Sequence, residues 1–423
     1  MSLLKIIGST RPINIDYAKF KQGSKNAALP IIGASLLFDN DLIIKNVPDI
    51  SDVYSILKIL NKINVSFNYE KNTFTKFSGD KFKKQSFSKD FFDTRGGFYL
   101  VAALINKWKK IKIKNYTVAG CRIGARGYDN IFRVLAEFGF VVNVIDDNLI
   151  INKTHKYSGG RIVLNDLGIC VSCVALILAA QFEHKTVLAN IGQAPEINDL
   201  INFLVANGVN IVRNKNNQLE VWKGSVKTRL KSFGIQDDRI VIATYAVLAL
   251  ISQGSFKIKS IKLQHLSSFI ELLKSTGCHI KENKKNNTTI ILRGRNMRPV
   301  QVLVDDYPRI STDIQPLLAT FLGTIKGSSI IKDNIFPLRN FHVEQLQKMN
   351  QSIAFKDGEI IIMGGNKFAG NQLCGHDIRC NAALIAAACV AHGVTLITDW
   401  EYVNRGYEHL LNIVKQNREL IIK

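Results

Sequence analysis

The segment TVLANIGQAPEINDLINFLVANGVNIV (residues 186–212) and the segment FKIKSIKLQHLSSFIELLKSTGCHI (residues 256–280) share one pattern. Each begins with a β-rich run, passes through a short loop into an amphipathic helix, and reaches a second β-rich run after a glycine. Phe269, Leu272 and Leu273 have the spacing that places apolar side chains on one helix face. Gly208 and Gly277 stand where a left-handed residue commonly ends a helix. The two segments therefore predict one α/β unit that is repeated.

The same unit recurs along the whole chain. In each copy a glycine or asparagine ends the helix, and we call this residue the break. Successive breaks are separated by nearly constant intervals along the chain. Six copies of roughly 70 residues are too many for a single hydrophobic core, so two bodies of three units each are expected. The predicted breaks are Asn61, Gly139, Gly208, Gly277, Asn350 and Asn417.

Each unit also carries a second helix that is apolar on all sides. Residues 97–105, 173–182 and 240–252 are examples, and such helices belong at the centre of a domain. The predicted fold class is therefore α/β, with two similar domains that each arrange three repeated units around buried helices. A cleft between two such bodies is where a ligand would be expected to bind.

The composition is that of an ordinary globular protein, with 46% hydrophobic and 21% charged residues in a chain of 423. The longest apolar stretches, residues 240–251 and 382–391, are too short to cross a bilayer. The first eleven residues lack the pattern of a signal peptide. We expect a cytoplasmic protein without a membrane segment, as a monomer or a weak homo-oligomer.

The formal net charge of +22 comes from lysines that are spread over predicted loops and strand ends. Because these lysines form no stripe with interleaved aromatic residues, a solvated surface is favoured over nucleic-acid binding. The seven cysteines include one close pair, Cys170 and Cys173, inside an apolar run. That context predicts buried thiols, and no metal site is expected.

QGSKNAALP, residues 22–30, places Lys25 and Asn26 directly before an apolar helix. A lysine at a helix N-terminus can hold an anion together with the helix amides. A capped helix with a solvated lysine explains the same residues, so the fragment alone leaves both interpretations open.

VAGCRIGARGYDN, residues 118–130, is a glycine-rich loop between a predicted strand and a predicted helix. In this loop Cys121 lies close to Arg122 and Arg126. Two guanidinium groups favour the thiolate form of a cysteine, and a mobile loop could close it over a ligand. The pattern therefore favours a reactive cysteine over a structural one.

Four arginines occupy otherwise apolar or helix-starting places: Arg95, Arg339, Arg379 and Arg405. An unpaired buried guanidinium is costly, so each requires an anionic partner. A structural salt bridge explains any one of them, whereas four at equivalent places in repeated units favour a polyanionic ligand. Asp313, in the segment STDIQP, stands at a predicted helix start, where a capping role would be a sufficient explanation.

Together these motifs resemble the enolpyruvyl transferase family, and within it the branch that acts on UDP-N-acetylglucosamine. GSKNAALP resembles the family's Lys-Asn motif, GCRIGAR its cysteine loop, and STDIQP its catalytic aspartate segment. HDIRCNAAL and NRGYEHL resemble its two C-terminal arginine motifs. The resemblance implies an inside-out α/β barrel type of fold, with residues 25–236 as the first domain and residues 1–24 plus 237–423 as the second.

The resemblance also implies a reaction, the first committed step of peptidoglycan synthesis. The carboxyvinyl group of phosphoenolpyruvate would move to the 3-hydroxyl of UDP-N-acetylglucosamine, and phosphate would leave without any cofactor. Asp313 would accept the hydroxyl proton and Cys121 would donate a proton to the substrate carbon. The catalytic residues implied are Cys121, Asp313, Lys25 and Arg405.

Two sets of binding residues follow from the same resemblance. The set implied for phosphoenolpyruvate is cationic: Lys25, Arg95, Arg126, Arg379 and Arg405. The set implied for the UDP-sugar is Asn26, Arg95, Arg126, Asp129, Asp313, Ile335 and Phe336.

The chain departs from the family pattern near the implied sugar site. LGICVSC, residues 167–173, replaces a Ser-Val-Gly-Ala-Thr type of loop, and Val241 stands where the family has an acid. Two alternatives therefore stay open, a catalytically silent or acceptor-altered paralogue and 3-phosphoshikimate 1-carboxyvinyltransferase. The second is disfavoured by Lys25-Asn26-Ala27 and by the cysteine loop.

Overall fold

The computed structural model describes residues 2–422, except 80–81, 83–85, 88–90, 92–95, 116–127 and 225–230. The chain divides into two compact units. What we call the first unit consists of the described residues of 23–236, and the second unit consists of residues 1–22 and 237–423. The chain passes between the units after Gln22 and again after Gln236.

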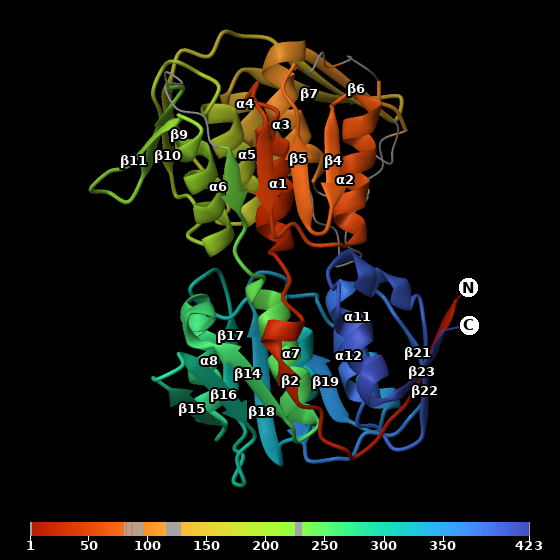
Figure 1. Cartoon of the computed structure of the whole chain (residues 1–423). Helices are drawn as coiled ribbons and strands as arrows, with labels where there is room; N and C mark the ends of the chain where they lie inside the picture. Colours follow the sequence, from red (N-terminus) through yellow and green to blue (C-terminus); the bar gives the residue numbers. More distant parts are fainter. Residues whose placement is uncertain are drawn as a thin grey trace. The chain divides into compact units, whose positions relative to one another are not determined.

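Three helices pack against one another at the centre of each unit (Figure 1). They are buried because their sequences are apolar around the whole circumference, and all thirteen residues of Arg239–Ile251 are buried. In the first unit they are α1 (Lys25–Ser35), α3 (Gly97–Trp108) and α5 (Ile169–Ala179). In the second unit they are α7 (Arg239–Ile251), α9 (Gln315–Gly323) and α11 (Ile378–Ala388).

Each repeated unit adds an amphipathic helix that buries one face only. In α4, for example, Ile131, Val134 and Leu135 are buried. The outer helices of the first unit are α2 (Ser51–Lys62), α4 (Asp129–Glu137) and α6 (Pro195–Ala206). Those of the second unit are α8 (Ser267–Ser275), α10 (Phe341–Lys348) and α12 (Leu410–Asn417).

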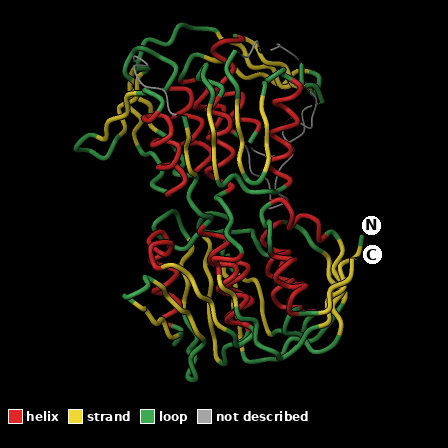
Figure 2. Tube along the Cα trace, in the orientation of Figure 1, coloured by secondary structure: helices red, strands yellow, loops and turns green. Residues whose placement is uncertain are grey.

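The strands of the first unit, yellow in Figure 2, pair in sheets that share one topology. In the first and third sheets a strand pairs in parallel with one neighbour and antiparallel with the other. In the second sheet the strands pair antiparallel, and the parallel contact is the isolated bridge between Phe87 and Ile113. The first sheet has the order β13 (Ser232–Gly234), β3 (Leu42–Lys45), β5 (Thr73–Lys76), β4 (Phe67–Glu70). The second has the order β6 (Lys110–Ile113), β8 (Asn148–Lys153), β7 (Phe140–Ile145). The third has the order β11 (Asn210–Arg213), β12 (Leu219–Trp222), β10 (Thr186–Ala189), β9 (Gly160–Val163).

The second unit repeats this topology in three sheets. One has the order β15 (His279–Asn283), β16 (Thr288–Leu292), β14 (Ser255–Lys259), β2 (Ile15–Asp16). Another has the order β17 (Gln301–Val304), β18 (Gly327–Asp333), β20 (Glu359–Gly364), β19 (Ser352–Lys356). The last has the order β21 (Gln372–Cys374), β22 (Val394–Thr398), β1 (Leu3–Ile7), β23 (Glu419–Ile422).

Strands from distant parts of the chain complete two of the repeats. β1 pairs antiparallel with both β22 and β23. In the other two sheets of the second unit the same position is occupied by β16 and β20, which lie next to their partners in the chain. In the same way, β13 pairs in parallel with β3. Together with the buried helices, these sheets confirm the predicted α/β class of three repeated units around a helical core in each body.

The left-handed residues after the outer helices agree only in part with the predicted breaks. Gly139, Gly208, Gly277 and Asn350 all have positive φ, from 67° to 91°. The other two predictions were wrong. Asn61 lies inside α2 and the left-handed residue is Asn64, with φ of 62°. Asn417 ends α12, where the chain continues directly into the extended Arg418.

Candidate active site

A carboxylate between two guanidinium groups is the most distinctive charged feature of the second unit. Asp313 lies in the turn before α9 and is not its N-cap, so the capping explanation is wrong. Its Oδ2 accepts a 3.0 Å hydrogen bond from Arg379, and its Oδ1 accepts two of 3.2 Å from Arg339. Both arginine side chains are buried, whereas that of Asp313 is 24% exposed. The aspartate compensates both buried charges and still has one solvent-accessible face.

Arg339 also holds the turn that carries Asp313. Its Nη1 donates to the carbonyl oxygen of Thr312 and, at 3.0 Å, to the Thr312 hydroxyl. That hydroxyl donates at 2.6 Å to Oδ2 of Asp333. The other carboxylate oxygen of Asp333 accepts from the amides of Ile335 and Phe336, at 2.9 and 2.8 Å. One hydrogen-bonded network therefore links Asp313 to the Ile335–Phe336 segment.

Arg379 is the second residue of α11 and lies against an aromatic ring. Its Cζ is 5.2 Å from the ring centre of Tyr407, whose hydroxyl is 2.9 Å from that of Thr244 on α7. Burial by itself lowers the pKa of Arg379, but Tyr407 and Asp313 outweigh it, and this pKa lies well above its ordinary value. Arg379 is therefore a permanent buried cation.

Arg405 ends the short 3-10 helix Trp400–Arg405 and is only partly buried. It directly precedes Gly406, where an added Cβ would lie 2.8 Å from Cγ2 of Ile378 and 3.4 Å from Nη1 of Arg379. The backbone after Arg405 therefore lies against the start of α11.

Lys25 begins α1 in the first unit and is paired with an acid. Its Nζ is 3.1 Å from Oδ2 of Asp52, and the two side chains are only 12% and 5% exposed. Asp52 lies in the first turn of α2, where a carboxylate is also favoured by the helix dipole. A fully solvated lysine is therefore excluded. Asn26, the next residue of α1, is partly buried.

The residues expected near a nucleotide lie at the N-termini of two other helices of the first unit. Asp129 begins α4 and is exposed. Gly168 precedes α5, and its amide donates at 2.7 Å to Asp166, which also accepts from Asn130 at 3.4 Å. In the second unit, Val241 is fully buried in α7, so at this position the acid of the family pattern is replaced by a core residue.

Arg95, Cys121 and Arg126 lie outside the described residues. Six other cysteines are free thiols, and burial raises the pKa of Cys173, Cys278, Cys380 and Cys389. Of the pair expected to be buried, Cys173 is buried and Cys170 is only partly buried, whereas Cys374 is exposed. Among the described residues, no group of three His, Cys, Asp or Glu side chains is arranged to hold a metal ion.

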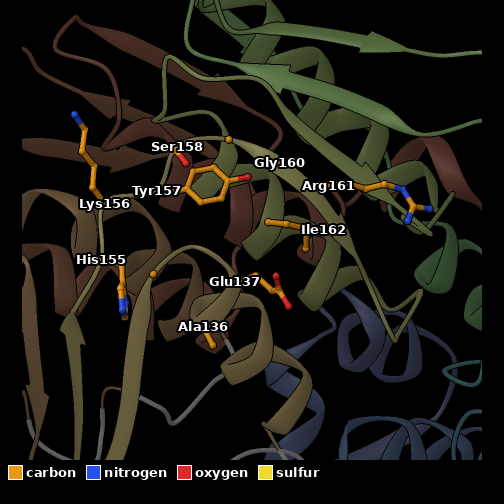
Figure 3. Close-up of a pocket in the computed structure, with 11 residues that line it drawn as sticks. Ala136, Glu137, His155, Lys156, Tyr157, Ser158, Gly160, Arg161 and Ile162 are labelled. Atoms are coloured by element: carbon orange, nitrogen blue, oxygen red, sulfur yellow. The ribbon is translucent and has the colours of Figure 1, made fainter.

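A small open pocket of about 320 Å³ lies in the first unit, between the end of α4 and the segment that leads into β9 (Figure 3). Glu137, His155, Tyr157 and Arg161 are among its lining residues, and Figure 3 shows Arg161 pointing away from the others. None of the site residues predicted from the sequence lines this pocket. It therefore gives no support to a catalytic site.

The structure explains why several supporting residues could not be foreseen. Asp52 has the sequence context of an ordinary first-turn acid, and Asp333 that of a residue in a strand–turn segment. Thr244 and Tyr407 meet only because α7 and the chain after Arg405 pack together. The sequence predicts that Arg339 needs an anionic partner, and Asp313 is that partner.

The fold and these charged residues define the class of protein, a two-unit α/β protein in which buried cations are gathered around a partly exposed aspartate. The family model described as EPSP synthase (3-phosphoshikimate 1-carboxyvinyltransferase) matches residues 21–414. The chain belongs to this family.

Two curated relatives show how far the similarity extends. UDP-N-acetylglucosamine 1-carboxyvinyltransferase of Pseudothermotoga lettingae is 30% identical, over 95% of both chains. The protein of the same name from Orientia tsutsugamushi is 31% identical, over 92% of both chains. The relatives thus match the chain along nearly its whole length.

Solved structures agree with the fold. The enolpyruvyl transferase NikO from Streptomyces tendae has a TM-score of 0.87 and 18% identity, over 100% of this chain and 99% of that one. EPSP synthase from Acinetobacter baumannii has a TM-score of 0.73 and 14% identity, over 100% of both chains. No helix in the described ranges is both long and apolar enough to span a membrane.

Proposed function

We propose that this protein is a transferase that moves the carboxyvinyl group of phosphoenolpyruvate to the 3-hydroxyl of UDP-N-acetylglucosamine, with release of phosphate. The observation that carries the proposal is Asp313, a partly exposed carboxylate held between the buried cations Arg339 and Arg379. Relatives that bear the name of this activity match 92–95% of the chain. Together these features favour carboxyvinyl transfer over a purely structural role.

Asp313 is assigned to proton transfer because one face of its carboxylate is accessible while its orientation is fixed. It takes the proton from the sugar 3-hydroxyl as that oxygen bonds to C2 of phosphoenolpyruvate. Cys121 gives a proton to C3, which completes a tetrahedral ketal phosphate. Loss of a proton from C3 and cleavage of the C2–O bond to phosphate then restore the vinyl group.

The cationic residues stabilise the charge that shifts during addition and elimination. Arg379 and Arg405 are assigned to the phosphate and carboxylate groups, together with Lys25, Arg95 and Arg126. Lys25 begins a helix, where amide groups add to the positive potential. Its partner Asp52 fixes the position of the ammonium group.

The acceptor is assigned to a second set of residues. Ile335 and Phe336 are held by Asp333 in the network that ends at Asp313, so sugar binding and the base share one scaffold. Asn26, Arg95, Arg126, Asp129 and Asp313 complete this set. We assign the first unit to the domain of the cysteine loop and the second unit to the domain of the aspartate.

We place the reaction in the cytoplasm, in the first committed step of peptidoglycan synthesis, and through that step it would affect cell shape and division. The six free cysteines of the described chain suit a reducing compartment.

Product analysis tests the proposal directly. The purified protein, incubated with phosphoenolpyruvate and UDP-N-acetylglucosamine, should form a product whose mass equals that of the sugar nucleotide plus one carboxyvinyl group, with one phosphate released for each product. Unchanged substrates after incubation with micromolar enzyme would contradict the proposal.

An altered acceptor is the second candidate, favoured by the local sequence at the start of α5. There LGICVSC, residues 167–173, replaces the Ser-Val-Gly-Ala-Thr type of loop of the family, and Cys170 is only partly buried. A product formed from a different UDP-sugar, but not from UDP-N-acetylglucosamine, would support this candidate.

A further inference from the structure

Gln22 is the last residue of the second unit before the chain passes to the first unit. Its side chain is 1% exposed, and both ends of its amide are occupied. Nε2 donates to the carbonyl oxygen of Gly406 at 2.9 Å, and Oε1 accepts from the amide of Glu408 at 2.9 Å. A single side chain therefore fixes the backbone of residues 406–408, directly after Arg405.

The backbone of Gln22 makes a second connection. Its carbonyl oxygen accepts from the amide of Asp238 at 2.9 Å. Asp238 caps α7 by accepting from the amides of Ile240 and Val241. The same helix carries Thr244, whose hydroxyl meets that of Tyr407. Gln22 is thus hydrogen-bonded to residues 406–408, which include Tyr407, and to Asp238, which caps α7. Thr244 of α7 in turn contacts the Tyr407 hydroxyl.

The segment that Gln22 fixes forms one wall around Arg379. The Tyr407 ring lies beside the guanidinium, and the missing side chain of Gly406 leaves room for Nη1. This Nη1 has no hydrogen-bond partner among the described residues, while Nη2 is bound to Asp313. Nη1 is buried beside Gly406 and the Tyr407 ring, so the position of this backbone segment decides where the guanidinium lies.

We propose that Gln22 is a positioning residue for phosphoenolpyruvate, acting through residues 406–408 on Arg379 and Arg405. This inference rests on the proposed function. Because both ends of the Gln22 amide are hydrogen-bonded, residues 406–408 are held in one position. A displacement of these residues would move the side chains of both Arg379 and Arg405. An apolar side chain of equal length would fill the space of Gln22 without fixing the backbone.

The variant Gln22→Met tests this inference because it retains the volume and removes both hydrogen bonds. The Michaelis constant for phosphoenolpyruvate should rise roughly 10-fold, which corresponds to two lost hydrogen bonds. The Michaelis constant for UDP-N-acetylglucosamine should change less than about 2-fold. The increase in melting temperature that phosphoenolpyruvate causes in the presence of the sugar nucleotide should shrink.

Gln181→Met is the matched control. The Gln181 amide also makes two backbone hydrogen bonds, to Ala102 and Ile177, but at the far end of α5 in the first unit. This variant should lose stability while both Michaelis constants stay unchanged. An equal effect of the two variants on phosphoenolpyruvate, or no effect of Gln22→Met, would overturn the inference.

Two further measurements keep the result interpretable. If Gln22→Met does not fold, Gln22→Asn takes its place, because it keeps an uncharged amide that is one methylene too short to reach both Gly406 and Glu408. If the unmodified protein forms no product, the proposed function has failed, and the melting shift with phosphoenolpyruvate still tests Gln22. An equal shift in wild type and variant would then overturn the inference separately.

Discussion

Arg379 donates a 3.0 Å hydrogen bond to Asp313, which lies 66 residues earlier in the chain. The bond joins the start of α11 to the turn before α9, two of the three helices at the centre of the second unit. Arg339 approaches the same carboxylate from the start of α10. Asp313 thus pairs with Arg339 of its own repeat and with Arg379 of the next repeat, and the proposed chemistry depends on this aspartate.

Replacing Asp313 by Asn should remove the proton acceptor and retain the shape of the side chain. We expect turnover to fall by at least about 100-fold, the usual range for a lost general base. Binding of UDP-N-acetylglucosamine, measured by calorimetry, should survive within roughly 10-fold. Asp305→Asn, which changes a more exposed aspartate in the same unit, is the control and should turn over normally. Normal turnover by Asp313→Asn would remove this residue from the mechanism.

The pair of Lys25 and Asp52 should contribute to stability as well as to charge placement. Asp52→Asn breaks a largely buried ion pair, so the free energy of unfolding should fall by about 2–3 kcal/mol in urea titrations. Glu220→Gln, which breaks the more exposed pair with Lys185 in the same unit, should cost less than about 1 kcal/mol. An equal loss of unfolding free energy in the two variants would show that burial does not strengthen the Lys25–Asp52 ion pair.

The network from Thr312 to Phe336 should govern sugar binding. Thr312→Val removes the hydroxyl that links Arg339 to Asp333, while the shape of the side chain is nearly unchanged. The Michaelis constant for UDP-N-acetylglucosamine should rise about 10-fold, because the Ile335–Phe336 segment loses its support. Thr320→Val, at a buried threonine bonded only within α9, is the control. A change confined to phosphoenolpyruvate would contradict the assignment of this segment.

Cys121 should be the thiol that reacts with the epoxide fosfomycin in the presence of the sugar nucleotide. Among the described cysteines, Cys374 is the exposed competitor, and four others are buried with raised pKa values. Peptide mass spectrometry should therefore find one adduct, on Cys121, in wild type and in Cys374→Ser alike. An adduct that disappears in Cys374→Ser would refute the assignment.

His342 should make stability depend on pH. Burial lowers the pKa of this side chain to about 3, below its ordinary value of 6.5, so the folded protein holds it neutral. The unfolded chain binds the proton first as the pH falls, and stability is lost below pH 6.5 and down to about pH 3. Between pH 7.5 and 5.5 this loss is roughly 1.4 kcal/mol.

The variant His342→Gln should reduce that pH dependence. Free energies of unfolding, measured in urea at the two pH values, should differ less in His342→Gln than in wild type. His184→Gln, at an exposed histidine, is the control and should leave the difference unchanged. An unchanged difference in both variants would contradict the burial of a neutral His342.

The repeats explain how much of the fold could be predicted. Apolar helices such as residues 240–252 reveal their burial in the sequence alone, and Gly208 and Gly277 mark helix ends because glycine takes positive φ easily. The prediction of a helix end at Asn61 was wrong because asparagine marks a positive φ less reliably than glycine does. The residue with positive φ is Asn64, three residues further on. The pairing of β13 with β3 could not be foreseen, since it joins segments almost 190 residues apart.

The site could be predicted where a charged residue type occurs in an apolar sequence context. Arg339 and Arg379 are conspicuous because buried guanidinium groups need partners, although the sequence did not reveal that both share Asp313. Asp52, Asp333 and Gln22 are ordinary in their local sequence. Their roles arise from contacts between distant segments, as in the 384-residue separation between Gln22 and Gly406. Only the folded structure brings such pairs together.

The most direct test of the central claim is acceptor-dependent release of phosphate from phosphoenolpyruvate. UDP-N-acetylglucosamine and shikimate 3-phosphate are offered separately to the wild-type protein, with Asp313→Asn as the inactive reference. We predict phosphate release with UDP-N-acetylglucosamine alone, and none from Asp313→Asn above background. Release with shikimate 3-phosphate instead, or with neither acceptor, would contradict the account.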